Sequence, residues 1–136
     1  MKNKAIPGIN IQWPWSQLLL SGKKTVETRS YDIPEKYRGV DLAIIETPGP
    51  RGKKDAGITK ARIIGTIVFE KTYRFQSVKH WQSEENLHFV PTKDPQYAWS
   101  KRDEVWGWVV KSVRKFSKPT IAPKNRGIIF TRKIEI

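Results

Sequence analysis

Three charged residues of this chain, Lys24, Glu27 and Arg29, lie close enough in sequence to act together. Successive side chains of a strand point to opposite faces, so Glu27 and Arg29 share one face, with Lys24 at its mouth. A carboxylate there can accept from an exocyclic amine such as that of cytosine, and a lysine or arginine can donate to a carbonyl or phosphate oxygen. Two interpretations follow: a structural Glu27–Arg29 ion pair beside a solvated Lys24, or a polar ligand pocket that uses all three residues.

The residues before these charges predict a short helix that delivers the strand. Trp15, Leu18 and Leu19 recur at helical spacing and form one apolar stripe, and Pro14 suits a first helical turn. Gly22 is the residue type that commonly follows the end of a helix in a left-handed conformation. We therefore expect a helix that ends just before Gly22 and turns directly into the charged strand.

The spacing of Gly22, Lys24, Glu27 and Arg29 after a Trp-Pro helix start resembles the motif of the ASCH family, a branch of the PUA-like β-barrels. The resemblance continues in the C-terminal part of the chain, in Trp106-Gly107-Trp108-Val109-Val110, Lys118-Pro119, Arg126-Gly127 and Ile128-Ile129-Phe130. It implies an α+β, mainly β fold: a PUA-like small β-barrel with two or three short helices, in a single domain over residues 1–136. It also implies a ligand pocket between the first helix and the barrel, which favours the second interpretation.

Apolar alternation and turn residues place the other elements. Strands are predicted over residues 9–13, 40–46, 61–73, 104–114 and 128–134, and a helix over residues 78–86 capped by Ser77. Gly65 is expected to bend the long strand that contains it. Residues 51–58 and 91–100 carry turn-forming or irregular patterns and are predicted to be loops.

The composition excludes several classes of protein. With 136 residues and no cysteine, the chain forms no disulfide and no thiolate metal site, and we expect no metal or other cofactor. No apolar run reaches the ~20 residues of a membrane-spanning helix, and the N-terminus lacks the apolar region of a signal peptide. We expect a soluble, cytoplasmic protein that does not bind a membrane.

Basic residues are in large excess and concentrate toward the C-terminus. Lys and Arg number 26 against 13 Asp and Glu, which gives a net charge of +13. Residues 111–136 hold eight Lys or Arg against one Glu, a balance of +7, and residues 51–62 hold five against one, a balance of +4. Such an excess is typical of proteins that bind a polyanion. We expect Lys118, Lys124 and Arg126 to form a basic rim that contacts phosphates, with RNA, another single-stranded nucleic acid or a nucleotide as the partner.

The tryptophans have two competing uses. Trp15 and Trp108 have apolar neighbours and are expected in the core. Trp99 and Trp81 lie beside basic residues, so each either stacks on a nucleobase or packs in the interior. Trp13 is a further candidate for ligand binding, as is Ser30 next to Arg29.

The resemblance leaves catalysis open. Some ASCH proteins are associated with ribonuclease activity, and others hydrolyse the amide of acylated cytidine with a lysine, a threonine three residues later and a distant glutamate. Lys24 matches that lysine, but Glu27 stands at the threonine position, and a carboxylate cannot take the role of that hydroxyl nucleophile. The candidate catalytic residues are Lys24 and Glu27, with Tyr31 as a third, and His80 and His88 are a further acid–base pair to consider. The chain is predicted to bind RNA or a modified nucleotide; the alternatives are a hydrolase at the same site and a basic adaptor for an acidic protein partner.

Overall fold

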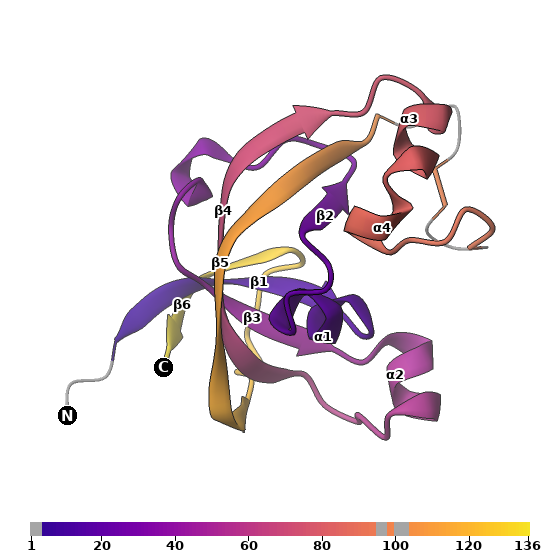
Figure 1. The fold of residues 1–136 in the computed structure, drawn as a ribbon. Coiled ribbons are helices and arrows are strands. Elements are labelled where there is room, and N and C mark those ends of the chain that lie inside the picture. Colours follow the sequence, from indigo (N-terminus) through magenta and orange to yellow (C-terminus); the bar gives the residue numbers. More distant parts are fainter. Residues whose placement is uncertain (1–3, 95–97, 100–103) are drawn as a thin grey trace.

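The chain folds into a curved six-stranded sheet, with most of its short helices at the end away from the two termini (Figure 1). The computed structural model describes residues 4–94, 98–99 and 104–136. Within these residues the strands are β1 (Ala5–Gln12), β2 (Val26–Arg29), β3 (Leu42–Thr47), β4 (Arg62–Arg74), β5 (Trp106–Ile121) and β6 (Phe130–Glu135). The helices are α1 (Trp15–Leu20), α2 (Gly49–Asp55), α3 (Val78–Ser83), α4 (Glu85–His88) and the 3-10 helix η1 (Glu35–Tyr37). No helix among the described residues is long and apolar enough to cross a membrane.

The sheet has the strand order β2-β5-β4-β3-β1-β6. β1 and β3 are parallel, whereas the other neighbours are antiparallel. The pairing of β4 with both of its neighbours shifts between Ile63 and Gly65, which confirms the predicted irregularity at this glycine. Because β2 and β6 are left as two edges, the sheet does not close. The predicted mainly β, barrel-like architecture is confirmed, with an open barrel.

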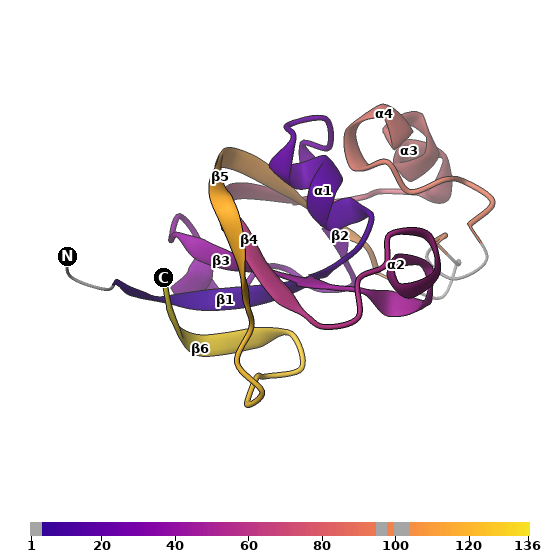
Figure 2. The ribbon, with the colours of Figure 1, turned by 90° about the horizontal axis from the view of Figure 1, so that it is seen from below.

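Two hydrophobic clusters fill the interior on opposite faces of β3. Ile44 belongs to the larger cluster, together with the predicted core residues Trp15 and Trp108. Ala43 and Ile45 belong to the smaller cluster. β3 is therefore buried on both faces, which explains why its sequence is a continuous apolar run and does not alternate. Figure 2 shows α1 on one side of the β1–β3 pair and β6 on the other.

Helix α1 packs tightly on the sheet at Gly65. A Cβ atom added to Gly65 would lie 2.7 Å from Cδ1 of Leu20 and 2.3 Å from the carbonyl oxygen of Arg114. Both distances are well inside van der Waals contact, so only a glycine lets the last turn of α1 and the neighbouring strand β5 approach so closely. This contact fixes the end of α1 from which the charged strand β2 begins.

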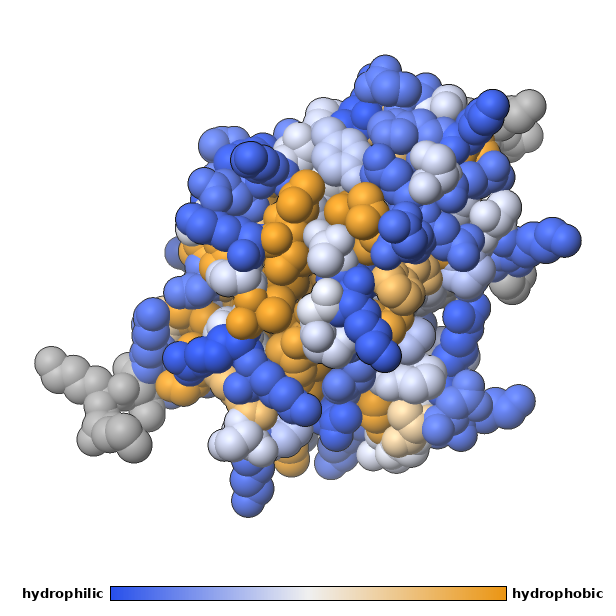
Figure 3. All heavy atoms as spheres, viewed as in Figure 1, coloured by the Kyte–Doolittle hydropathy of each residue, from blue (hydrophilic) through white to orange (hydrophobic). Residues whose placement is uncertain are grey.

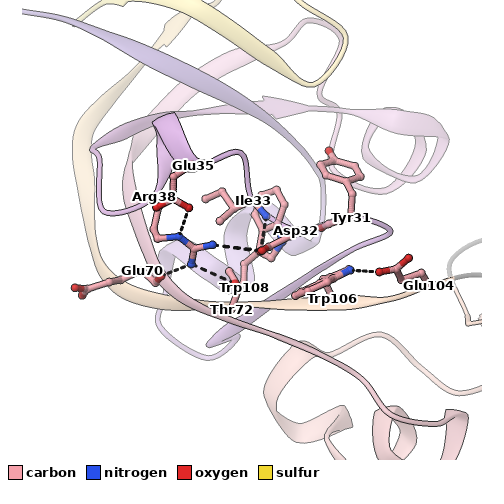
Figure 4. Close-up of polar contacts among 10 residues, drawn as sticks. All are labelled: Tyr31, Asp32, Ile33, Glu35, Arg38, Glu70, Thr72, Glu104, Trp106 and Trp108. Atoms are coloured by element: carbon pink, nitrogen blue, oxygen red, sulfur yellow. Dashed lines mark hydrogen bonds and ion pairs between the residues drawn. The ribbon is translucent and has the colours of Figure 1, made fainter.

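The segment between β2 and β3 is fastened to the two long strands (Figure 4). The guanidinium of Arg38 donates to the carbonyl oxygen of Glu70 at 2.8 Å and to the hydroxyl of Thr72 at 3.2 Å. The indole of Trp108 donates to the carbonyl oxygen of Tyr31 at 3.1 Å. These bonds hold the segment that follows β2 against β4 and β5, and so fix where β2 ends.

Three segments differ from the sequence predictions. The segment predicted as a basic loop over residues 51–58 is largely helical, because α2 covers Gly49–Asp55 with a proline in its first turn and Lys53 and Lys54 in its last. Proline is well tolerated at that position, and lysines suit a helix C-terminus, so these residues are compatible with a helix as well as with a loop. β5 extends to Ile121, seven residues beyond the predicted end of that strand. The predicted helix over 78–86 exists as two short helices, α3 and α4, with Ser77 as the predicted N-cap.

Candidate ligand-binding site

The local fold brings the three charges together as the sequence pattern requires. Gly22 follows the end of α1 with a φ of +83°, the left-handed conformation expected there. The backbone N–H of Lys24 then donates to the carbonyl oxygen of Leu18 at 3.0 Å, which holds the reversed chain against the helix. β2 begins at Val26 and pairs with β5, so that Glu27 lies opposite Trp108. The predicted helix, glycine turn and strand are all confirmed.

Lys24, Glu27 and Arg29 form one connected ion cluster. Arg29 holds one carboxylate oxygen of Glu27 through two nitrogens, with Nε at 3.2 Å and Nη2 at 2.9 Å from Oε2. The ammonium of Lys24 lies 3.3 Å from the other carboxylate oxygen and also donates to the carbonyl oxygen of His88. Nη2 of Arg29 donates in addition to the carbonyl oxygen of Asn10 at 3.0 Å. The cluster therefore connects β2 to α4 on one side and to β1 on the other.

Burial distinguishes this cluster from a surface ion pair. The side chains of Lys24, Glu27 and Arg29 are 0%, 8% and 18% exposed. The interpretation that paired Glu27 with Arg29 and left Lys24 solvated is therefore wrong in its account of Lys24. Its ammonium is turned inward because α4, more than sixty residues later in the chain, supplies the His88 carbonyl as an acceptor.

Burial and mutual attraction oppose each other in the cluster, and the pKa values show which effect dominates. Burial disfavours the charge on Glu27, but Arg29 and then Lys24 outweigh it and lower the pKa of that carboxyl. Burial is also the largest effect on Lys24 and lowers the pKa of its ammonium, although Glu27 opposes it. For Arg29, Glu27 and Tyr31 overcome burial and raise the pKa. Glu27 is thus a firmly ionised carboxylate between two donors.

The cluster lies in the wall of a pocket of about 480 Å³. The lining comes from β1, α1, β2 and α3, from the end of β3 and from the chain on both sides of residues 95–97. Three aromatic side chains face it, those of Trp15, Trp81 and Trp99. Polar side chains complete the lining, among them those of Asn10, Gln12, Thr28, Ser30 and Thr47. A pocket with this volume and mixture of groups is large enough for a small organic ligand.

Asn10 is a pocket residue that the sequence analysis did not single out. Its amide nitrogen donates to the carbonyl oxygens of Gly127 at 3.0 Å and Ile128 at 2.8 Å. Its amide oxygen is buried and accepts no hydrogen bond from any described residue. Asn10 and Gln12 alternate with Ile9 and Ile11 in β1, so the period-2 pattern of that strand was the available signal for a polar face.

The other predicted site residues fall in different places. Ser30 and Trp99 line the pocket, as do Lys24, Glu27 and Arg29. The side chains of Trp13 and Tyr31 do not belong to its lining. Trp13 packs on α2, where a Cβ added to Gly52 would lie 3.3 Å from the Trp13 Cβ.

The predicted basic rim is divided in space. Lys124 and Arg126 are exposed on the loop between β5 and β6, next to the carbonyl oxygens that Asn10 binds. The guanidinium of Arg126 donates to the carbonyl oxygen of Pro123 at 2.6 Å. Lys118 lies on β5 and lines a separate groove. The loop that carries Lys124 and Arg126 is therefore joined to the pocket residue Asn10 through its backbone, whereas Lys118 belongs to the other groove.

The histidines do not form an acid–base pair. His88 is buried, donates from Nε2 to the carbonyl oxygen of Trp81 at 2.7 Å and accepts at Nδ1 from the N–H of Val90 at 3.0 Å. Burial lowers the pKa of His88, which keeps the imidazole neutral. His80 instead contacts Glu84, with 3.1 Å between Nε2 and Oε2. His88 also stacks on Trp81, with ring centroids 4.8 Å apart, so Trp81 has a packing role although its edge reaches the pocket.

Comparison with known proteins agrees with this geometry. The family model of the ASCH domain matches residues 9–120, which run from the middle of β1 to the penultimate residue of β5. The chain belongs to the ASCH domain family. This PUA-like fold family is generally linked to RNA binding. Within the residues that the structure describes, no group of three or more His, Asp or Glu is placed to hold a metal ion.

Solved structures of ASCH from Zymomonas mobilis share the fold of this ASCH domain. The first is 17% identical with a TM-score of 0.62, and the match covers 85% of this chain and 72% of that chain. A variant of that protein with a serine replaced by alanine is 16% identical with a TM-score of 0.66, over 93% of this chain and 86% of that chain. At such low identity the likeness establishes the fold alone. No curated protein matches the chain.

Proposed function

We propose that this ASCH domain binds RNA by holding one nucleobase, plain or modified, in the pocket between α1 and the barrel. The observation that carries the proposal is the buried cluster of Lys24, Glu27 and Arg29 in a pocket wall that also holds tryptophans. Burying three charges is costly unless they are paired, and a fixed carboxylate with cationic neighbours is well suited to read the polar edge of a base.

Trp99 supplies the flat surface that a base needs. It is half-buried and lines the pocket, whereas Trp15 and Trp81 are almost fully buried. An aromatic side chain that keeps part of its ring accessible can stack on a base, and such stacking contributes ~1–3 kcal/mol per base. This difference in burial supports stacking for Trp99 and packing for Trp81.

Two acceptors in the pocket wall keep acceptor positions that the described residues do not fill. A carboxylate offers about four acceptor positions, and Glu27 receives hydrogen bonds or ion-pair contacts from three nitrogens of Lys24 and Arg29. The amide oxygen of Asn10 receives none from the described residues. Both groups favour a base with an exocyclic amine, such as cytosine, over one with a carbonyl at the same position.

The phosphate of the bound nucleotide would lie toward the loop between β5 and β6. Lys124 and Arg126 are exposed there, and the loop is tied to the pocket through Asn10. This arrangement supports their predicted role as phosphate contacts.

Titration with cytidine and uridine monophosphates tests the proposal. We expect the protein to prefer the cytidine nucleotide by about tenfold, because only cytosine presents an amine to the two acceptors. Trp99→Ala should weaken binding by about tenfold or more through lost stacking, while Trp99→Phe, which keeps a ring, should retain most of it. Binding of neither nucleotide, or equal binding by the parent and both variants, would contradict the proposal.

The same samples separate the alternatives. Single-stranded RNA and an acylated cytidine are incubated with the parent protein and the reaction is followed for products. Strand fragments or free cytidine would identify the site as that of a hydrolase. Binding without products supports recognition alone, and an absence of nucleic-acid binding at physiological salt leaves the acidic-partner adaptor.

A further inference from the structure

A second basic surface lies at the opposite end of the sheet from the pocket. A groove runs between the C-terminal half of β5 and β6, at the place where the sheet stays open. β6 pairs with β1, and β5 pairs with β4 and, near its start, with β2. Figures 1 and 2 show the two termini and the end of β5 on this side of the molecule, away from α2, α3 and α4.

The groove collects cations from three separate parts of the chain. Its basic lining residues are Lys4, Arg114, Lys115, Lys118 and Lys133, against one acidic residue, Glu135. Of these five cations, only Lys4 forms an ion pair among the described residues, at 3.9 Å from Asp41. Figure 3 shows hydrophilic side chains projecting around the lower end of this face. The charges repel one another in the folded protein, and a bound polyanion would relieve that repulsion.

Protection of a sheet edge is the simpler explanation for lysines on β5. Lysines and prolines on an exposed edge prevent other chains from pairing with it. That purpose needs charges along one strand, but it does not need Lys133 of β6 and Lys4, before β1, to line the same hollow as Lys118. Because basic side chains from three parts of the chain line one groove, a bound ligand explains them better than edge protection does.

The groove and the pocket are too far apart for one nucleotide. Lys4, at one end of β1, lines the groove, and Gln12, at the other end, lines the pocket. Asn10, the pocket residue of β1 nearest to Lys4, is six steps away along the strand, which is about 20 Å at ~3.3 Å per residue. A ligand that reaches both sites must be a chain of several nucleotides.

We propose that this groove holds the sugar–phosphate backbone of a single-stranded nucleic acid, several nucleotides away from the base in the pocket. The proposal rests on the proposed function of the pocket for the class of ligand. The groove itself supplies no sequence preference, because it offers cations to phosphates and lies apart from the polar pocket groups that read a base edge. The groove instead raises the affinity for strands that are long enough to reach it.

The test compares two probes and two matched variants. The probes are an RNA of about twelve nucleotides, within the ~4–16 that small domains cover, and an abasic strand of the same length. The abasic strand carries phosphates without bases, so it reports on phosphate contacts and not on the binding of a base in the pocket. The groove variant is Lys115→Gln with Lys118→Gln and Lys133→Gln. The control variant is Lys36→Gln with Lys71→Gln and Lys79→Gln, three exposed lysines outside both linings that change the net charge equally.

Three lost contacts should flatten the plot of log affinity against log salt by about 2 units for both probes. Between about 50 and about 200 mM salt, the parent should then lose about 20-fold more affinity than the groove variant, while the control variant follows the parent. Binding of cytidine monophosphate should not change in the groove variant.

The outcomes separate the two proposals. If the slope of log affinity against log salt is unchanged in the groove variant and cytidine monophosphate still binds, the groove proposal is overturned and the pocket proposal is retained. If the groove variant no longer binds the abasic strand and the parent binds no mononucleotide, the groove proposal is supported and the pocket proposal is overturned. If a poly-glutamate peptide binds the parent as tightly as RNA does, and the groove variant no longer binds it, the groove belongs to an acidic protein partner.

Discussion

A fully buried lysine needs acceptors for its ammonium group, and Lys24 has two of them, the Glu27 carboxylate and the His88 carbonyl. The carboxylate in turn is held by both nitrogens that Arg29 directs at it. Removing any member of such a group leaves a buried charge without its partner. The three residues therefore serve stability as well as recognition, and a variant at one of them has to be measured for both.

Glu27→Gln should reveal this dual role through its pH dependence. Removing the carboxylate leaves Lys24 and Arg29 buried without their anion, at a cost of about 3–5 kcal/mol near neutral pH. Because the pKa of Glu27 is lowered by folding from 4.5, its contribution is fully present above that pH and is lost as the pH falls through the folded-state pKa. Urea unfolding between about pH 7 and about pH 3 should show the parent and the variant converging only in acid.

A matched control for this experiment is Glu135→Gln. Glu135 is exposed and forms no ion pair among the described residues, so its loss should change stability by less than ~0.5 kcal/mol at every pH. A Glu27→Gln difference that is small at neutral pH would show that the cluster does not stabilise the fold, and a large difference that stays constant down to the lowest pH would show that the ionised carboxylate does not carry the stabilisation.

At this scale the sequence predicted relationships along one strand and missed those that depend on distant segments. Glu27 and Arg29 share a strand face, as the alternation requires, and they do form an ion pair. The burial of Lys24 depends on α4, and the hydrogen bonds of the Asn10 amide nitrogen depend on the loop before β6. Neither contact leaves a local pattern, so neither could be read from spacing.

Among the elements, α1 has a strict packing requirement, because its last turn rests on Gly65. Gly65→Ala would force the new methyl group against the Arg114 carbonyl and Leu20. Overpacking of this kind typically costs ~1–3 kcal/mol, and here the backbone of β5 has to move. Thermal or urea unfolding measures the loss.

Ser112→Ala is a control for the Gly65 variant. Ser112 is exposed on β5, so this change should stay within ~0.5 kcal/mol of the parent. A Gly65→Ala protein as stable as the control would mean that α1 does not rest on the sheet as tightly as the distances indicate.

The elements that the sequence misplaced are those in which proline has two meanings. A Pro-Gly-Pro run such as Pro48 to Pro50 is typical of a loop, but here the prolines stand at the start of α2, where a missing N–H has no cost. Lys118-Pro119 was expected after the end of a strand, but β5 continues through it. Pro119 is tolerated because β5 is there unpaired on its outer edge, and its pairing with β4 is shifted between Lys115 and Thr120.

The molecule as a whole carries a net charge of +13, and its two proposed binding surfaces lie at opposite ends of the sheet. Lysines kept together for a ligand should lower the stability of the free protein. The variant with Lys115→Gln, Lys118→Gln and Lys133→Gln is therefore expected to unfold at a higher temperature than the parent at low salt. The difference should shrink near 0.1 M salt, where the screening length falls to about 10 Å. A variant less stable than the parent would show that these lysines support the fold.

The base-binding pocket is the central claim, and a crystal soaked with cytidine monophosphate tests it most directly. The account predicts that the cytosine ring stacks on Trp99, with its exocyclic amine within hydrogen-bond distance of the Glu27 carboxylate or the Asn10 amide oxygen. It also predicts the phosphate on the side of Lys124 and Arg126. A nucleotide bound elsewhere, with the pocket empty beside an intact ion cluster, would contradict the claim and leave the three charges with a structural role alone.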